Sequence, residues 1–228
     1  MTAPFASDES PTAMRLIGIN GGTFDPIHYG HLRPALEVQQ SLDLEQVRFV
    51  PCYQPVHRGQ PSVSAVQRCE MIELAIAGQP SFCLDTIEID RGGPSYMVDT
   101  LAALKQRYAD SEESTALVLI MGTDAFANFH KWHNWQEILR LANIAVTHRP
   151  GEALPLYCQA GQILRAHHVR RFSQCCEQIV DVPVTQLDLS ATALRNYLHQ
   201  GQSVDYLMPP SVIDYIQQHQ LYRDAKGN

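Results

Sequence analysis

Short apolar runs alternate with amphipathic segments along most of this 228-residue chain. Continuous apolar runs, such as residues 116–121, are typical of strands that are buried on both faces of a parallel sheet. Longer segments, such as residues 95–108, place apolar side chains three and four positions apart, which is the spacing of one helix face. The alternation predicts an α/β fold with a doubly wound, mostly parallel sheet that binds ligands at the carboxyl ends of its strands.

The same pattern gives the order of the elements. Strands are predicted over residues 15–19, 46–51, 82–89, 116–121, 143–147 and 178–184. Helices are predicted over residues 32–42, 63–77, 95–108, 136–141, 192–198 and 211–219, with Pro34 in the first turn of the first helix. Residues 150–178 give only a weak signal. The order predicts one domain over residues 14–228, with a small C-terminal helical part from about residue 190.

The composition is that of an ordinary globular protein, with 45% hydrophobic and 18% charged residues. No apolar run approaches the roughly 20 residues that cross a bilayer, and the net charge of −7 lacks the basic excess of nucleic-acid binders. Residues 1–13 do not resemble a secretory signal, and their composition predicts a disordered extension. Six cysteines without a CxxC motif predict free thiols, and therefore a cytoplasmic protein.

The most informative stretch is residues 21–31, Gly-Gly-Thr-Phe-Asp-Pro-Ile-His-Tyr-Gly-His, between the first strand and the first helix. A glycine pair lets a ligand approach the backbone, and free N–H groups at the helix start suit a phosphate. His28 and His31, just before the helix and at its start, can both point at that phosphate. The alternative is a capped helix with two surface histidines, but it requires neither the second glycine nor both histidines. The stretch therefore predicts a phosphate-binding site.

Two later motifs offer cations to phosphates. His57 and Arg58 lie on a loop after the second strand, where the guanidinium fork suits a phosphate monoester, although such pairs are more often surface decoration. Ser190, Thr192 and Arg195 bracket a helix start, where they can cap the helix and also donate to a polyphosphate. A plain capped helix explains the second motif equally well when it is taken alone.

Two other motifs offer contacts to a nucleoside or a flat ring. Gly122 and Asp124 follow the buried strand over residues 116–121, and a carboxylate there can accept from a ribose hydroxyl or cap a helix. Residues 129–135 contain both tryptophans of the chain. One of them can stack on a heterocycle, although core packing is the usual role of a tryptophan.

Residues 21–31 resemble the signature of the nucleotidyltransferase superfamily, which includes the class I aminoacyl-tRNA synthetases. The order GGTFDPIHYGH, HR, PSY, GTD, a Trp-rich segment, RPG and SATALR closely resembles the bacterial nicotinate-nucleotide adenylyltransferases. The likeness covers residues 15–223. It implies a Rossmann-like nucleotidyltransferase fold and a reaction of NAD biosynthesis, in which ATP and nicotinate mononucleotide give deamido-NAD and pyrophosphate.

The resemblance also implies a role for each matching residue. The catalytic set is His28, His31 and Arg195. The ATP-binding set is Gly21, Gly22, Thr23, Phe24, Gly122, Asp124, Arg149, Ser190 and Thr192. The mononucleotide-binding set is Arg58, Thr86, Tyr96, Trp132 and His133, of which Arg58 meets the phosphate and the others frame the pyridine ring.

Magnesium is the one cofactor that the resemblance implies. Because no paired carboxylates are visible in the sequence, Mg²⁺ is expected to bind mainly through the substrate phosphates, with no dedicated protein site. Asp25 precedes Pro26, and we predict a turn and cap residue there rather than a metal ligand. The chain is expected to act as a monomer or a homodimer.

Three other functions fit parts of this pattern. Related adenylyl- or cytidylyltransferases act on phosphopantetheine or glycerol phosphate, but they are usually shorter and lack the aromatic segment. An enzyme that prefers nicotinamide mononucleotide would share every motif. A catalytically silent nucleotide sensor would be marked by the loss of His28 or His31, and both histidines are present.

Overall fold

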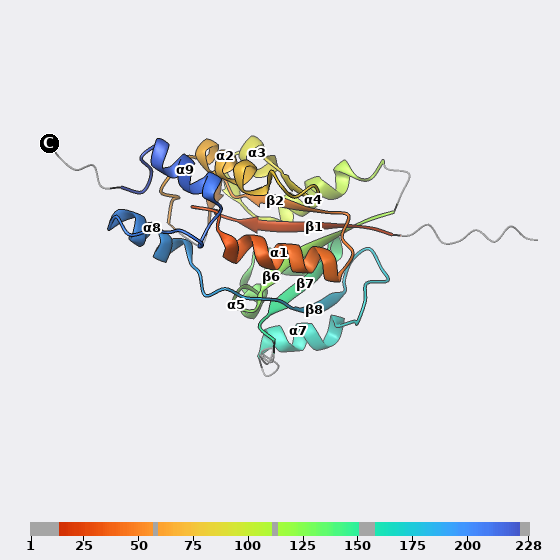
Figure 1. Cartoon of the computed structure of the whole chain (residues 1–228). Coiled ribbons are helices and arrows are strands. Elements are labelled where there is room, and N and C mark those ends of the chain that lie inside the picture. Colours follow the sequence, from red (N-terminus) through yellow and green to blue (C-terminus); the bar gives the residue numbers. More distant parts are fainter. Residues whose placement is uncertain (1–13, 57–58, 111–113, 151–157, 224–228) are drawn as a thin grey trace, which may run out of the picture.

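The computed structural model describes residues 14–56, 59–110, 114–150 and 158–223. Its main sheet has six strands, all paired in parallel, in the order β4-β2-β1-β6-β7-β8 (Figure 1). The strands are β1 (Arg15–Gly22), β2 (Gln46–Pro51), β4 (Phe82–Leu84), β6 (Thr115–Gly122), β7 (Asn143–His148) and β8 (Ile179–Pro183). Two short strands, β3 (Gln54–Pro55) and β5 (Pro94–Ser95), pair with each other. The predicted doubly wound parallel sheet is confirmed.

Helices cover both faces of this sheet. Apolar side chains of α1 (Tyr29–Ser41), α2 (Ala65–Ile76), α8 (Ala191–His199) and α9 (Pro210–Gln218) belong to one hydrophobic cluster. Those of α4 (Met97–Arg107), α5 (Thr123–Ala127), α6 (Trp135–Leu141) and α7 (Gln159–His167) belong to a second cluster. The remaining helices are α3 (Ile87–Arg91) and the 3₁₀ turn η1 (Phe129–Lys131). Within the described ranges, no helix is long and apolar enough to cross a membrane.

Strand β6 lies between the two clusters. Val118 and Ile120 belong to the first cluster, and Leu117, Leu119 and Met121 belong to the second. Because successive side chains point to opposite faces of a sheet, both faces of β6 are buried. This is the arrangement that its continuous apolar run predicts.

The strand predicted over residues 82–89 is wrong in its second half. β4 ends at Leu84, and α3 begins at Ile87. Between them, the buried Asp85 carboxylate accepts a hydrogen bond from the Ile87 N–H group at 3.1 Å. This bond turns the chain into a helix where the alternation of apolar and polar residues alone suggested a strand.

Most other differences concern where helices begin. α1 starts at Tyr29, so Pro34 lies in its second turn rather than its first. α2 starts at Ala65, because Ser64 forms a capping box with Gln67.

The weak segment over residues 150–178 contains α7, which the pattern missed. The C-terminal helices α8 and α9 lie within one residue of their predicted bounds, and the predicted extension over residues 1–13 lies outside the described residues.

The sheet grows in two directions from β1. The chain first adds β2 and β4 on one side, and then returns to add β6, β7 and β8 on the other side. The direction reverses between β1 and β6. In doubly wound folds, ligands bind at the carboxyl ends of the strands beside such a reversal.

Candidate active site

A cleft of about 800 Å³ lies at this reversal. Residues 20–25, at the end of β1, and residues 119–122, at the end of β6, both line it. Most of the predicted site residues also line it, namely Gly21, Gly22, Thr23, Phe24, His31, Tyr96, Gly122, Trp132, His133, Ser190, Thr192 and Arg195. The fold therefore collects into one cleft side chains that are far apart in the sequence.

The two histidines of the motif cap the start of α1 together. His28 is the N-cap residue, and its Nδ1 atom accepts from the Gly30 N–H group at 3.1 Å. The Nδ1 atom of His31 accepts from the His28 N–H group at 3.3 Å, and the two ring centroids lie 3.8 Å apart. Because each Nδ1 is an acceptor, the proton of a neutral ring is on Nε2. The capping arrangement therefore turns both rings into Nε2–H donors.

The environments of the two histidines differ. His31 lines the cleft, whereas His28 is only 3% exposed and is not among the lining residues. Burial lowers the pKa of His28 from 6.5 to about 4. His28 is therefore neutral near pH 7, and its Nε2–H group is a donor with no net charge.

Gly30 makes room for this pair. A Cβ atom at position 30 would lie 2.8 Å from both Cε1 and Nδ1 of His28. A side chain here would push the imidazole off its cap. The glycine of the HxGH motif is thus required by packing.

The prediction of free N–H groups at the start of α1 is wrong. The amides of residues 29–32 are all hydrogen-bonded within the protein: Tyr29 donates to the Leu207 carbonyl at 3.1 Å, and the other three donate to Nδ1 or the carbonyl oxygen of His28. A phosphate in the cleft would therefore meet histidine side chains rather than unpaired helix amides.

Across the cleft, α8 carries the second predicted motif. Ser190 is the N-cap residue and accepts from the Ala193 N–H group at 3.2 Å, as its predicted capping role requires. Arg195 donates through Nη1 to the Asp25 carbonyl oxygen at 2.6 Å and through Nη2 to Thr192 Oγ1 at 3.3 Å. These contacts fix the guanidinium beside the motif of β1. We use the name histidine–arginine end of the cleft for five lining residues and for the buried His28, which is hydrogen-bonded to His31. The lining residues are Asp25, His31, Ser190, Thr192 and Arg195.

Asp25 does not cap a helix, so that part of its prediction is wrong. It lies in a turn, but its carboxylate is buried and accepts from the Ser62 N–H group at 2.7 Å and from the Tyr222 hydroxyl at 2.8 Å. Arg68 supports the same turn: its side chain is 1% exposed and donates through Nη1 to the Thr23 carbonyl at 2.8 Å. No sequence motif pointed to Ser62, Arg68 or Tyr222.

The aromatic end of the cleft consists of Tyr96, Trp132 and His133. The rings of Tyr96 and His133 lie 4.5 Å apart, and Trp132 packs edge-on against the buried Phe129 at 5.9 Å. Tyr96 is placed by the pairing of β3 with β5, where Ser95 Oγ accepts from two N–H groups of the β2–β3 segment. This end presents ring surfaces, and its side chains make few hydrogen bonds.

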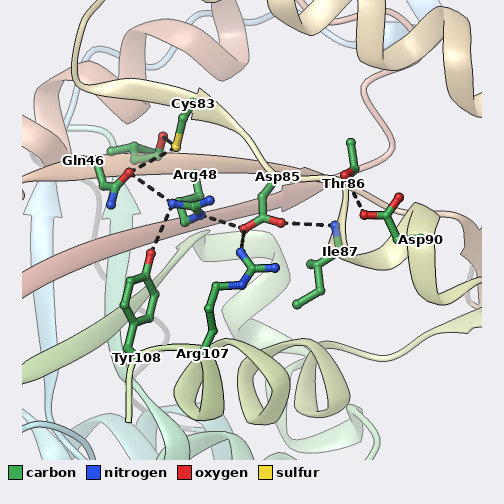
Figure 2. Close-up of polar contacts among 10 residues, drawn as sticks. Gln46, Arg48, Cys83, Asp85, Thr86, Ile87, Asp90, Arg107 and Tyr108 are labelled. Atoms are coloured by element: carbon green, nitrogen blue, oxygen red, sulfur yellow. Dashed lines mark hydrogen bonds and ion pairs between the residues drawn. The ribbon is translucent and has the colours of Figure 1, made fainter. Parts of the chain in front are cut away.

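Thr86 is not among the residues that line the cleft. It precedes α3 and donates its hydroxyl to Asp90 at 2.8 Å. Its neighbour Asp85 accepts from both Arg48 and Arg107 at 2.7 Å, as Figure 2 shows. This network around the buried Asp85 carboxylate anchors the loop that carries Thr86.

Two other predicted residues also lie apart from the lining. Asp124, in the first turn of α5, and Arg149, after β7, are exposed and do not line the cleft. Arg58 lies outside the described residues. Conversely, the lining includes the buried Glu88 and also Cys52, which follows β2, and neither belongs to a motif recognisable in the sequence.

The described residues contain no group of three histidine, cysteine, aspartate or glutamate side chains that could hold a metal ion. The buried carboxylates beside the cleft are already engaged. Asp25 accepts two hydrogen bonds and lies 3.7 Å from Arg195, and Glu88 accepts from the Thr100 hydroxyl at 2.6 Å. A Mg²⁺ ion that is bound mostly by substrate phosphates and water fits this donor set.

Comparison with known proteins places the chain in a family. The sequence model of the family described as "Cytidylyltransferase-like" matches residues 19–197. The "Probable nicotinate-nucleotide adenylyltransferase" of Hydrogenovibrio crunogenus is 64% identical over 209 residues, which cover 92% of this chain and 98% of that protein. The protein of the same name from Methylococcus capsulatus is 42% identical over 212 residues, covering 91% and 99%.

A solved structure supports the same fold. The nicotinic acid mononucleotide adenylyltransferase of Plasmodium falciparum, complexed with NaAD, has a TM-score of 0.68 at 16% identity, over 91% of this chain and 97% of that one. The matching family model and the extensive identity to both bacterial proteins agree with the motifs and with the cleft. The chain belongs to the cytidylyltransferase-like family and, within it, to the nicotinate-nucleotide adenylyltransferases.

Proposed function

We propose that this protein transfers AMP from ATP to nicotinate mononucleotide, releasing pyrophosphate and forming deamido-NAD in NAD biosynthesis. The names of its bacterial relatives support this substrate pair. The observation that carries the proposal is the reciprocal capping of His28 and His31, which makes Nε2 of His31 a donor in the cleft that Arg195 also lines. Such donors suit a reaction in which negative charge moves between phosphates.

The chemistry needs no general base. An oxygen of the mononucleotide phosphate, already ionised near pH 7, attacks the α-phosphorus of ATP while the bond from that phosphorus to the bridging oxygen of pyrophosphate breaks. The role of the protein is to align two polyanions and to stabilise charge on the phosphorus centre and the leaving group. We assign His31, with His28 beside it, to the transferred phosphate, and Ser190, Thr192 and Arg195 to the leaving pyrophosphate.

The rest of the cleft would hold the two nucleosides. Residues 21–24 and Gly122 line the side of the cleft that we assign to ATP. We assign Asp124 and Arg149 to ATP on the resemblance of the motifs alone. The aromatic end would hold the pyridine ring, and we assign Arg58 and Thr86 to the mononucleotide as well. Mg²⁺, when it accompanies ATP, supplies charge neutralisation on the phosphate oxygens.

The substrate preference is testable with one assay. Pyrophosphate release from ATP is measured with nicotinate mononucleotide, nicotinamide mononucleotide, phosphopantetheine and glycerol phosphate in turn. A site built for a carboxylate leaves donors unmatched against an amide NH₂, at about 1–3 kcal/mol for each unmatched donor. With two such donors, kcat/KM should favour the acid on the order of a hundredfold.

Each other outcome has a defined meaning. Equal specificity constants for the acid and the amide would refute the pathway assignment and keep the adenylyltransferase class. Faster release with phosphopantetheine or glycerol phosphate would assign the chain to a different transferase. No release with any acceptor, together with ATP binding, would favour a nucleotide sensor.

We place the protein in the cytoplasm as a monomer or homodimer. The cysteines of the described residues form no disulfide, which suits a reducing compartment. The proposed substrates are small metabolites, and neither a membrane nor a nucleic acid is needed for the reaction.

A further inference from the structure

The C-terminal segment reaches the histidine–arginine end of the cleft through one side chain. Tyr222 follows α9 and is half-buried, and its hydroxyl donates to Oδ1 of Asp25 at 2.8 Å. Burial and the neighbouring Asp25 carboxylate raise the pKa of Tyr222, so the hydroxyl keeps its proton near neutral pH. Tyr222 is therefore a fixed donor to a carboxylate that is only 3% exposed.

Asp25 stands between Tyr222 and Arg195. Its Oδ2 atom accepts from the Ser62 N–H group at 2.7 Å and lies 3.7 Å from Arg195 Nη1. That same nitrogen donates to the carbonyl oxygen of Asp25 at 2.6 Å. Arg195 is thus held closely by an uncharged carbonyl and only loosely by the carboxylate. The other donors to the carboxylate, Ser62 and Tyr222, keep it in this orientation.

We propose that Tyr222 is a positioning residue for the binding of the leaving pyrophosphate. By holding Oδ1 of Asp25, its hydroxyl prevents a closer ion pair between Asp25 and Arg195. The guanidinium then keeps donors and positive charge available for phosphate oxygens. The inference deepens the proposed function and rests on it, because it requires Arg195 to bind the β- and γ-phosphates of ATP.

Removal of the hydroxyl would release this arrangement. In Tyr222→Phe, Oδ1 of the buried carboxylate loses its partner, and a buried acceptor without a partner is costly. Rotation of the carboxylate toward Arg195 satisfies Oδ1, and the closer pair draws the guanidinium away from the cleft. Binding of pyrophosphate and ATP should weaken, whereas the aromatic end is untouched.

Tyr215 provides a matched control. It lies in α9, and its exposed hydroxyl donates to Glu70 of α2, so Tyr215→Phe also removes one tyrosine–carboxylate hydrogen bond of the C-terminal region. Neither Tyr215 nor Glu70 lines the cleft. The lost bond leads to Arg195 in the first variant and not in the second, and it is part-buried at Tyr222 and exposed at Tyr215.

The experiment compares wild type, Tyr222→Phe, Tyr215→Phe, Arg195→Lys and the double variant Tyr222→Phe/Arg195→Lys. Calorimetry measures the Kd of magnesium pyrophosphate, and steady-state kinetics measures KM for ATP and for nicotinate mononucleotide. In Tyr222→Phe, we expect Kd and the ATP KM to rise roughly tenfold with an unchanged mononucleotide KM. Tyr215→Phe should match wild type, and Tyr222→Phe should add little in the Arg195→Lys background.

Three results would overturn the proposal. They are a wild-type pyrophosphate Kd in Tyr222→Phe, equal rises in both KM values, and a full additional effect in the Arg195→Lys background. Thermal melts show whether each variant is folded at the assay temperature. If wild type shows no turnover with any acceptor, the proposed function fails, but the pyrophosphate titrations still decide the role of Tyr222.

Discussion

The two ends of the cleft are constructed on different principles. At the histidine–arginine end, side chains are oriented by hydrogen bonds to the backbone and to buried groups, such as the bond from Arg195 to the Asp25 carbonyl. At the aromatic end, side chains meet through ring contacts, such as that of Tyr96 with His133, and His133 is exposed. Hydrogen bonds therefore fix the orientation of the side chains at the first end. At the second end, ring contacts fix mainly the separation of the rings.

This difference matches what each end has to recognise. Donors that stabilise developing charge must already be aimed before the reaction, because reorientation would cost the energy that they supply. A planar ring needs contact area and exclusion of water, and it tolerates small shifts of its neighbours. We therefore expect substitutions at the histidine–arginine end to lower kcat or ATP binding, and those at the aromatic end to alter mononucleotide binding.

The largest effect should come from His31→Ala. Loss of one donor aimed at developing charge lowers kcat on the order of a hundredfold to a thousandfold. The KM for the mononucleotide should change little. Stopped assays of pyrophosphate release measure both quantities. Turnover near the wild-type rate in a folded variant would show that His31 takes no part in the reaction. It would also contradict the proposed difference between the two ends of the cleft.

Next is the pH dependence of stability, which tests the burial of His28. Its pKa is 6.5 unfolded and about 4 folded, so the unfolded chain binds a proton first as pH falls. Stability that is present above pH 6.5 is therefore lost progressively down to about pH 4. Between pH 7 and pH 5 this loss is about 2 kcal/mol.

The variant His28→Asn keeps a capping acceptor but cannot titrate in this range. Urea unfolding at pH 7 and pH 5 gives the loss for each protein, and the difference between the two proteins isolates His28. An identical loss in both proteins would mean that the imidazole is solvated in the native state.

A smaller effect is expected for Arg195→Lys. The charge remains, but the planar fork that donates to Asp25 and Thr192 is lost. The ATP KM should rise roughly tenfold, with the mononucleotide KM unchanged. Kinetics with each substrate varied in turn checks this. A rise in the mononucleotide KM alone would assign Arg195 to the other substrate.

The smallest effect should come from Trp132→Leu at the aromatic end. Loss of a stacking ring costs about 0.5–1.5 kcal/mol, so the mononucleotide KM should rise severalfold while the ATP KM stays constant. Trp135→Leu is the matched control, because Trp135 also contacts Phe129, at 5.8 Å, but does not line the cleft. Equal effects of the two variants would assign Trp132 to packing.

Much of the histidine–arginine end could be predicted because its chemistry is compact in the sequence. His28 and His31 are three residues apart, and Ser190, Thr192 and Arg195 span two turns of chain at one helix start. Strand β6 was equally predictable, because residues 116–121 are all apolar, as expected for a strand that is buried on both faces. Local patterns of this kind predict the structure because they depend on residues that are close together in the sequence.

What failed depended on contacts that no local pattern contains. The motif predicts free amides at the start of α1, but the Tyr29 amide donates to the carbonyl of Leu207, near the other end of the chain. The alternating residues after β4 indicated a strand, but the buried Asp85 binds two arginines and ends it. Asp25 contacts Ser62 and Tyr222, which are 37 and 197 residues away in the sequence.

Gly30 carries a practical consequence for directed evolution of this enzyme. Its amide hydrogen orients the His28 ring, and its missing side chain leaves the space that the ring occupies. In a mutant library that randomises position 30, we expect substitutions to lower activity because any Cβ atom there would displace the His28 ring. Screens for altered acceptors should keep position 30 constant and place their diversity around Tyr96 and His133.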